Sequence, residues 1–350
     1  MSKHLLVAIA DKNYLDKVKQ LFSSVYFNAG WKGDYMLMVH DVPEKDLEWF
    51  TSRGILVRLC DLIHSGEVSG IIYPPIDASV PAVERRGIEL FRRLPIVLSK
   101  FELFTDEFKK WDTILYLDCD IIVRHSLEIL TKVKGFYAGA DFFNTPLGGQ
   151  FYQDSFNRET FTRLEHSFDL HRLSFNTGVM AFSTDIIKND TYERLYETFR
   201  TYHTVCIFGD QPILNLFFYT TWKKLHVSYN FFTASLDDRH DGQGVECAVG
   251  ATILHSCSHK KLWLPESIFY DEWKSNLEKA DQIDLDHRPD NATAFEMLNP
   301  TVPLPILNES TVYRIRLHLI RSYIDRYLGL VGIFLKKYFP KIYMILKSKI

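Results

Sequence analysis

The chain is poor in cysteine and has no long hydrophobic run. Its five cysteines form no Cys-x-x-Cys pair and no even framework, which argues against a disulfide-stapled secreted fold. No segment reaches about 18 uninterrupted apolar residues, so the sequence predicts no transmembrane helix. The first ten residues are typical of one short apolar strand and carry no signal-peptide pattern. We therefore expect a cytoplasmic protein with reduced thiols.

The chain as a whole also lacks a strong excess of either charge, but its last forty residues are strongly basic. The formal net charge is −3, and residues 311–350 hold nine Lys or Arg and one acid, so they carry +8 and the remainder −11. Aromatic and aliphatic residues are interleaved with these cations. The pattern predicts a basic amphipathic tail on an anionic membrane surface and gives no reason to expect nucleic-acid binding. The alternative is a helix packed on the main domain with its charges in solvent.

The chain is long enough, and at 46% hydrophobic residues apolar enough, to build a large α/β domain. Apolar runs alternate with helical patterns along it, which predicts a mainly parallel sheet with crossover helices. We expect strands over residues 4–10, 35–39, 55–59, 114–123, 135–140 and 179–182. We expect helices over residues 14–26, 43–53, 88–108, 190–203 and 211–219.

Two aspartates set two apart within residues 114–123 are the most informative feature of the chain. In a strand, side chains at positions i and i+2 lie on the same face, so Asp118 and Asp120 should converge while Cys119 points away. Burying two carboxylates is costly unless they are paired or bind a metal. Divalent cations prefer oxygen ligands, so the pair predicts a metal site. The plainer alternative is a strand end rich in turn-forming aspartate.

A second polar cluster occupies residues 253–263. His255 offers an imidazole, which is a good nitrogen ligand for Mn²⁺-like metals. Lys261 can bind phosphate as a point charge, and Trp263 can pack the loop down. Alone, His255 is typical of an ordinary polar position, whereas the three residues together favour a functional loop.

Two further motifs combine polar residues with a turn. Asn176 precedes Gly178 at the start of an apolar strand, and its amide suits sugar hydroxyls, although a simple loop entering a strand fits equally well. Asp210 stands at a helix start before Gln211 and Pro212. From its position it is expected to cap that helix, which leaves Gln211 free to face a substrate.

An Asp-x-Asp after an apolar strand does not name a reaction by itself. Haloacid-dehalogenase-like phosphatases also use this pattern, with the first aspartate as nucleophile. They need a later pair of acids, which Asp237 and Asp238 could supply. A sugar-nucleotide binding module without catalysis is the other alternative.

Taken in chain order, the motifs resemble glycosyltransferase family 8, the retaining family of GT-A fold that includes glycogenin and the bacterial lipo-oligosaccharide galactosyltransferases. The resemblance covers residues 4–265 and rests on an ordered set of four motifs. They are Leu-Asp118-Cys-Asp120, Phe-Asn176-Thr-Gly178, Asp210-Gln211 and His255-x-x-Ser258-x-x-Lys261-x-Trp263. Ser258 stands where the family usually has Gly, and Leu262 where it usually has Pro before Trp.

The resemblance implies a role for each matching residue. Asp118, Asp120 and His255 would ligate Mn²⁺, with Mg²⁺ as the alternative ion. The other residues expected to hold a UDP-sugar donor are Ala10, Asp11, Tyr14, Lys100, Cys119, Gly178, Ser258 and Lys261. The catalytic residues expected around the transferred sugar are Asn176, Asp210 and Gln211.

The implied protein is a Mn²⁺-dependent, retaining hexosyltransferase that uses a UDP-sugar and a glycan or lipid-linked glycan acceptor. We expect a GT-A catalytic domain over residues 1–265 and a proline-containing extension over 266–310. The basic tail, residues 311–350, would hold the protein peripherally on a membrane.

Overall fold

The computed structural model describes residues 3–60, 94–141, 145–152, 157–233, 248, 250–257 and 261–287. Contacts divide the chain into two units, Met1–Val302 and Pro303–Ile350. The predicted basic tail falls in the second unit, outside the described residues. Among the described residues, no helix has the length and hydropathy needed to cross a membrane.

A seven-stranded sheet in the order β3-β2-β1-β4-β7-β6-β8 forms the centre of the first unit. The first four strands of that order are mutually parallel, whereas β7 runs antiparallel to both β4 and β6, and β8 is parallel to β6. The strands are β1 His4–Ala10, β2 Asp34–Val39, β3 Leu56–Leu59, β4 Thr113–Leu117, β6 Phe136–Ala140, β7 Phe175–Ser183 and β8 Trp222–Lys224. The mainly parallel sheet predicted from the sequence is confirmed.

A smaller sheet stands beside the large one. Its strands are ordered β5-β10-β9, with β10 antiparallel to β5 and parallel to β9. They are β5 Ile121–Val123, β9 Phe231–Phe232 and β10 Ile253–His255. This sheet was not predicted, because β5 was taken as the continuation of the strand before it and strands as short as β9 and β10 leave little pattern in a sequence.

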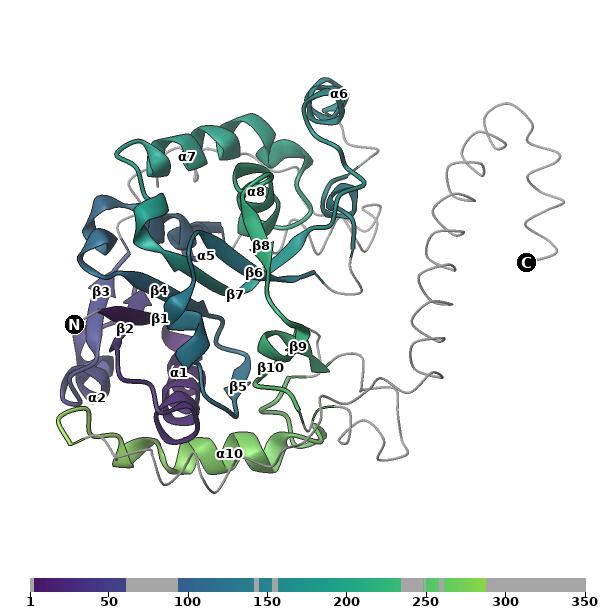
Figure 1. The fold of residues 1–350 in the computed structure, drawn as a ribbon. Helices are drawn as coiled ribbons and strands as arrows, with labels where there is room; N and C mark the ends of the chain where they lie inside the picture. The colour runs from purple at the N-terminus through teal and green to yellow at the C-terminus, as the bar shows by residue number, and fades with distance from the viewer. Residues whose placement is uncertain are drawn as a thin grey trace, which may run out of the picture. The chain divides into compact units, whose positions relative to one another are not determined.

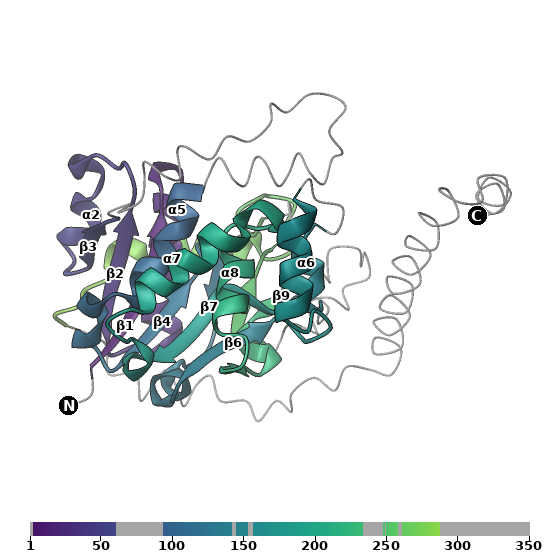
Figure 2. The same cartoon turned by 90° about the horizontal axis from the view of Figure 1, so that it is seen from above.

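Helices cover both faces of the large sheet (Figure 1). Figure 2 shows α7 and α8 lying over its strands, and α1 packs against α10 on the other side. The helices are α1 Leu15–Ser24, α2 Glu48–Thr51, α5 Leu94–Leu98, α6 Arg158–Ser167, α7 Thr191–Tyr202, α8 Asp210–Phe217 and α10 Tyr270–Glu278. α10 lies within the predicted extension and belongs to the first unit.

The two faces have separate hydrophobic cores because side chains alternate along each strand. In β1, Leu5, Val7 and Ile9 enter the core under α7 and α8, whereas Leu6 and Ala8 enter the core under α1. All seven residues of β1 except His4 are buried. A strand buried on both faces reads as a continuous apolar run, which is why β1 could be predicted from the sequence.

Two predicted helices are shorter than the sequence patterns indicated. Residues 43–53 form a 3₁₀ turn, Glu44–Asp46, and then the single turn of α2. In residues 94–108, the five residues of α5 pass into the 3₁₀ turns Ser99–Phe104 and Asp106–Lys110. Both segments bury aromatic side chains, so tertiary packing selects tight turns where a helical pattern was read.

Candidate active site

A cavity of about 680 Å³ opens where β1, β4 and β10 end and β7 begins. Twelve of the predicted site residues line it: Ala10, Asp11, Tyr14, Lys100, Asp118, Cys119, Asp120, Asn176, Asp210, Gln211, His255 and Lys261. The thirteenth, Gly178, lies directly behind the cavity wall, against His255 and Asp118. Ser258 lies outside the described residues.

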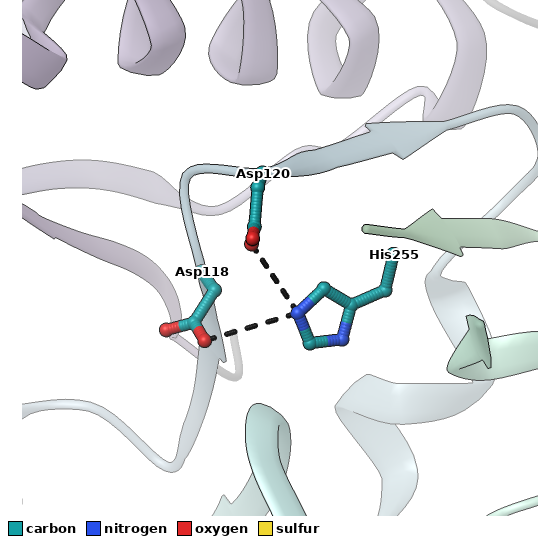
Figure 3. A group of neighbouring side chains, drawn as sticks. All are labelled: Asp118, Asp120 and His255. Carbon is teal, nitrogen blue, oxygen red and sulfur yellow. Dashed lines mark ion pairs between the residues drawn. The ribbon is translucent and has the colours of Figure 1, made fainter. Parts of the chain in front are cut away.

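Asp118, Asp120 and His255 point toward one another (Figure 3). His255 Nε2 lies 3.2 Å from Asp120 Oδ1 and 3.9 Å from Asp118 Oδ2. One ligand atom from each residue lies within 4.8 Å of the other two. Two carboxylate oxygens and one imidazole nitrogen are a ligand set that can hold a divalent cation.

The two aspartates converge for a reason other than the one predicted. β4 ends at Leu117, and residues 118–120 form a bend between the large sheet and the small one. The register of β5 with β10 then pairs His255 with Ile121, which brings the imidazole beside Asp120. The prediction of one continuous strand over residues 114–123 is therefore wrong, because the chain changes sheets at the two aspartates.

Each aspartate uses its second oxygen to pair with a lysine. Lys100 Nζ lies 3.1 Å from Asp118 Oδ1, and Lys261 Nζ lies 2.5 Å from Asp120 Oδ2. The oxygens that face His255 are the other two, Asp118 Oδ2 and Asp120 Oδ1. The lysines thus compensate part of the buried negative charge and leave one oxygen of each carboxylate directed at the centre of the group.

The charges around the group suit a bound cation. Burial alone would raise the pKa of Asp120, but His255 and Lys261 lower it below its usual range. Burial alone would lower the pKa of His255, but Cys257 and Asp120 raise it well above its usual range. Burial raises the pKa of the Cys257 thiol, so the thiol is neutral at neutral pH and Asp120 supplies the negative charge. A divalent cation fits this environment because it would take over the positive charge of the imidazolium.

Gly178 makes room for the metal ligands. A Cβ at this position would lie 2.2 Å from His255 Cε1 and 2.9 Å from Asp118 Oδ2. The register of β7 with β4 fixes the closeness, since Asp118 donates its backbone N–H to the Gly178 carbonyl at 2.8 Å. Any side chain here would displace the imidazole, so the predicted close backbone approach at Gly178 has a definite structural cause.

The opposite side of the cavity is a set of hydrogen-bonded amides. Asn176 Nδ2 donates to Gln211 Oε1 at 3.0 Å, and Gln211 Nε2 donates to Asp141 Oδ2 at 3.1 Å. The Thr177 hydroxyl donates to Asp210 Oδ2 at 2.7 Å. The structure therefore brings the three predicted catalytic residues together and orients each of them.

Asp210 does not cap a helix. It is the first residue of α8, the helix has no side-chain cap, and Gly209 occupies the N-cap position. The carboxylate turns instead to Lys100 Nζ at 3.0 Å and to Thr177. The capping interpretation is wrong, because Lys100 is buried between Asp118 and Asp210 and pairs with both.

The sequence profile of glycosyl transferase family 8 matches residues 5–267. This chain belongs to that family. Glycosyltransferase GlyF of Streptococcus pneumoniae is 27% identical over 277 residues, which cover 77% of this chain and 59% of GlyF. Galactinol synthase 4 of Arabidopsis thaliana is 26% identical over 252 residues, or 70% of this chain and 66% of that protein. The chain thus spans less than two thirds of the length of GlyF.

Solved structures show the same fold at low identity. The galactosyltransferase LgtC, in complex with donor and acceptor sugar analogs, has a TM-score of 0.53 at 16% identity, over 83% of this chain and 99% of LgtC. The bifunctional glycosyltransferase WbbM has a TM-score of 0.55 at 16% identity, over 81% of this chain and 52% of WbbM. The predicted family and the GT-A fold are both confirmed. Membership in family 8 argues against the phosphatase alternative, whose second acid pair, Asp237 and Asp238, lies outside the described residues.

Two of the predicted residues, Asp11 and Tyr14, lie on the side of the cavity nearest β1. Tyr14 meets Trp263 edge-on, with ring centroids 5.9 Å apart. Asp11 accepts the backbone N–H of Asn13 at 2.8 Å and caps a short 3₁₀ turn. Tyr14 therefore joins the first strand to the predicted Lys261–Trp263 loop, and Trp263 packs that loop down as expected.

Sequence reasoning missed several residues that line the cavity. Asp141 follows β6 directly, as Asp118 follows β4, so an aspartate after an apolar strand was a usable signal. Tyr116, which donates to Asp118 Oδ1 at 2.5 Å, read only as part of an apolar strand. Phe208 and Cys257 lie in the cavity wall and left no signal in the sequence.

Proposed function

We propose that this protein transfers a hexose from a UDP-sugar to a hydroxyl of a glycan or glycolipid acceptor, with Mn²⁺ as cofactor and with retention of the α configuration. One observation carries the proposal. The ligand atoms of Asp118, Asp120 and His255 converge in a cavity of about 680 Å³ that is also lined by two lysines and a row of amides. Such a cavity offers a place for a metal-bound diphosphate and, beside it, polar groups for a sugar.

Asp118, Asp120 and His255 would hold the cation, and Mg²⁺ is the alternative to Mn²⁺. When bound, a divalent cation supplies Lewis-acid stabilisation to the diphosphate of the donor. Lys261 would bind the same diphosphate as a point charge. Its Nζ donates to Asp120 Oδ2 and, at 2.7 Å, to the Ser256 carbonyl oxygen. Lys261 therefore lies at the edge of the candidate metal site.

Gln211 would lie near the anomeric carbon, with Asn176 and Asp210 beside it on the sugar. The bond from the anomeric carbon to the diphosphate oxygen breaks, and a bond to the acceptor oxygen forms on the same face. The departing phosphate takes the acceptor proton, so no carboxylate nucleophile is needed. Asp118 and Asp120 would be occupied by the metal, which disfavours a glycosidase-like carboxylate pair.

The uridine would occupy the side of the cavity nearest β1. Ala10, Asp11 and Tyr14 line that side, and Cys119 donates its thiol to the Ile9 carbonyl at 3.1 Å. Cys119 therefore supports the end of β1, where the base and ribose would bind. Lys100 would act on the donor through Asp118 and Asp210, between which it is buried.

The proposed membrane contact and the proposed lipid-linked acceptor are both inferred from the sequence of the tail. Nine cations against one acid in residues 311–350 support contact with an anionic membrane, worth about 1 kcal/mol per cation near the surface. A lipid-linked acceptor would then be within reach of a protein held at the cytoplasmic face. Changing Arg326, Lys336, Lys337 and Lys341 together to Gln should abolish co-sedimentation with phosphatidylserine vesicles, and unchanged co-sedimentation would refute membrane binding.

The test of the proposed function is release of UDP from a panel of UDP-sugars with Mn²⁺ and then with EDTA. We expect slow, metal-dependent hydrolysis of one donor among glucose, galactose, GlcNAc, GalNAc and xylose. UDP binding without turnover of any donor, even with glycan acceptors added, would indicate the binding-module alternative. Absence of UDP binding would overturn the proposal.

A further inference from the structure

Asn230 is a buried residue between β9 and the turn before it, and it contacts the predicted metal ligand His255. The residue is only 3% exposed. Asn230 Oδ1 lies 2.8 Å from His255 Nδ1, the ring nitrogen on the far side from the aspartates. Its Nδ2 donates to Asn176 Oδ1 at 3.1 Å. Asn230 therefore stands between the metal ligands and the amides that would bind the sugar.

Backbone donors fix the direction of these hydrogen bonds. The Gly178 N–H donates to Asn176 Oδ1 at 2.9 Å, and a backbone N–H cannot turn round. Asn176 Oδ1 is thus an acceptor, so the Asn230 atom that faces it must be the NH₂ group. The carbonyl oxygen of Asn230 then faces His255, and because that oxygen can only accept, His255 Nδ1 must carry a hydrogen.

The direction of the hydrogen bonds is also fixed at the other end of the cavity. The Thr177 N–H donates to Gln211 Oε1 at 3.2 Å, and Asn176 Nδ2 donates to the same oxygen at 3.0 Å. Gln211 Nε2 is left to donate to Asp141, a carboxylate that accepts. Two backbone amides of β7 therefore orient every side-chain amide from Asn230 to Gln211.

Two glycines leave space for this arrangement. A Cβ on Gly139 would lie 2.7 Å from Asn230 Cβ and 2.8 Å from its Nδ2. The pairing of β6 with β7 shifts register at this glycine, between Ala138 and Ala140. Gly178 leaves the corresponding space for His255. The pair of side chains thus sits in a slot made by two glycines on neighbouring strands.

We propose that Asn230 is a positioning residue, which holds the hydrogen of His255 on Nδ1 so that Nε2 is free for the cation, and which couples this ligand to Gln211 through Asn176. This inference rests on the proposed function, since it assumes a divalent cation between Asp118, Asp120 and His255. Hydrogen-bond partners of metal-bound histidines commonly fix the ring nitrogen that binds the metal, and their loss costs about 10–100-fold in metal affinity or activity.

Asp and Leu have nearly the shape of Asn, so the two substitutions separate hydrogen bonding from packing. Asn230→Leu removes both hydrogen bonds, and we expect Mn²⁺ affinity to fall about 10–100-fold. Asn230→Asp keeps an oxygen for His255 Nδ1–H but cannot donate to Asn176. We expect it to bind Mn²⁺ within a few-fold of the wild type while kcat for UDP release falls at least about tenfold.

The experiment is a titration of the full-length protein with Mn²⁺, followed by the electron paramagnetic resonance signal of the free ion, with kcat and KM measured in parallel. Asn276→Leu is the control, because Asn276 is an equally buried asparagine on α10 whose amide donates to the Glu272 carbonyl. We expect this control to bind Mn²⁺ as the wild type does.

Four results would overturn the proposal. Wild-type Mn²⁺ affinity in Asn230→Leu would show that Asn230 does not position the ligand. Equal loss of Mn²⁺ affinity in the Leu and Asp variants would show that the oxygen facing His255 Nδ1 is not what positions the ligand, and wild-type kcat in Asn230→Asp would remove the coupling to Gln211. A wild-type protein that binds no Mn²⁺ would fail at the first step, and would refute the proposed function together with this inference.

Discussion

The two sides of the cavity are held in place in different ways. On the side nearest β1, Tyr14 and Asp11 are fixed by a ring contact and by a bond to neighbouring backbone. On the opposite side, Asn176 and Gln211 are hydrogen-bonded to each other and, through Asn230, to the metal ligand His255, while Thr177 and Lys100 hold Asp210. A change on the first side should therefore stay local, whereas a change on the second should spread to the metal.

Asp120→Ala should have the largest effect, because it removes a metal ligand and the partner of Lys261 and His255 together. We expect metal-dependent UDP release to fall at least about 100-fold, with the far-ultraviolet circular dichroism spectrum unchanged. Asp106→Ala is the control, since that exposed aspartate pairs only with Lys109 among the ion pairs of the described residues. Full turnover by Asp120→Ala would remove this residue from the metal site.

Lys100→Met should cost the most stability. It leaves Asp118 and Asp210 without the cation that is buried between them, and breaking a buried pair costs about 3 kcal/mol. Urea denaturation measures the loss. Lys110→Met, at a lysine whose side chain is 57% exposed, should change the free energy of unfolding by less than about 1 kcal/mol. Equal stability of the two variants would show that the buried pair is not required.

Gly178→Ala tests how strictly the second side depends on space. The new methyl group would meet His255 Cε1, so the imidazole must move away from the aspartates. We expect Mn²⁺ affinity to fall about tenfold or more, while UDP affinity measured in EDTA is unchanged. Wild-type Mn²⁺ affinity in this variant would mean that His255 can shift without loss of metal binding. It would contradict the view that a change on this side of the cavity spreads to the metal.

Tyr14→Leu should have the smallest effect, and it tests the first side. The loss of one edge-on contact with Trp263 is worth about 1 kcal/mol, so UDP affinity should fall about fivefold. Calorimetric titration with UDP and with Mn²⁺ separates the two sides, because Mn²⁺ affinity should not change. A fall in Mn²⁺ affinity would show that the first side is also coupled to the metal.

The parts of the fold that could be predicted are those specified by local pattern. β1 is buried on both faces and reads as one apolar run, and its alternation with α1 indicates a parallel sheet. The small sheet could not be predicted, since β9 has two residues and β5 and β10 have three each. Its strands form through the pairing of Ile121–Val123 with Ile253–His255, two segments that are far apart in the sequence.

The site divides in the same way. Asp118, Asp120 and His255 could be predicted because carboxylates and imidazoles are common metal ligands and because the order of the motifs matches that of family 8. Asn230 could not, because an asparagine between a turn and a two-residue strand carries no pattern. Asn230 lies against Gly139, where the pairing of β6 with β7 shifts register, and no local sequence signal specifies that contact.

The most direct test of the account is calorimetric titration of the wild-type protein with UDP, once with Mn²⁺ and once with EDTA. If Asp118, Asp120 and His255 hold a cation that contacts the diphosphate, UDP affinity should be at least about tenfold higher with Mn²⁺, and His255→Ala should remove most of this difference. Equal UDP affinity with Mn²⁺ and with EDTA would contradict the central claim that the three residues form a metal site for the donor.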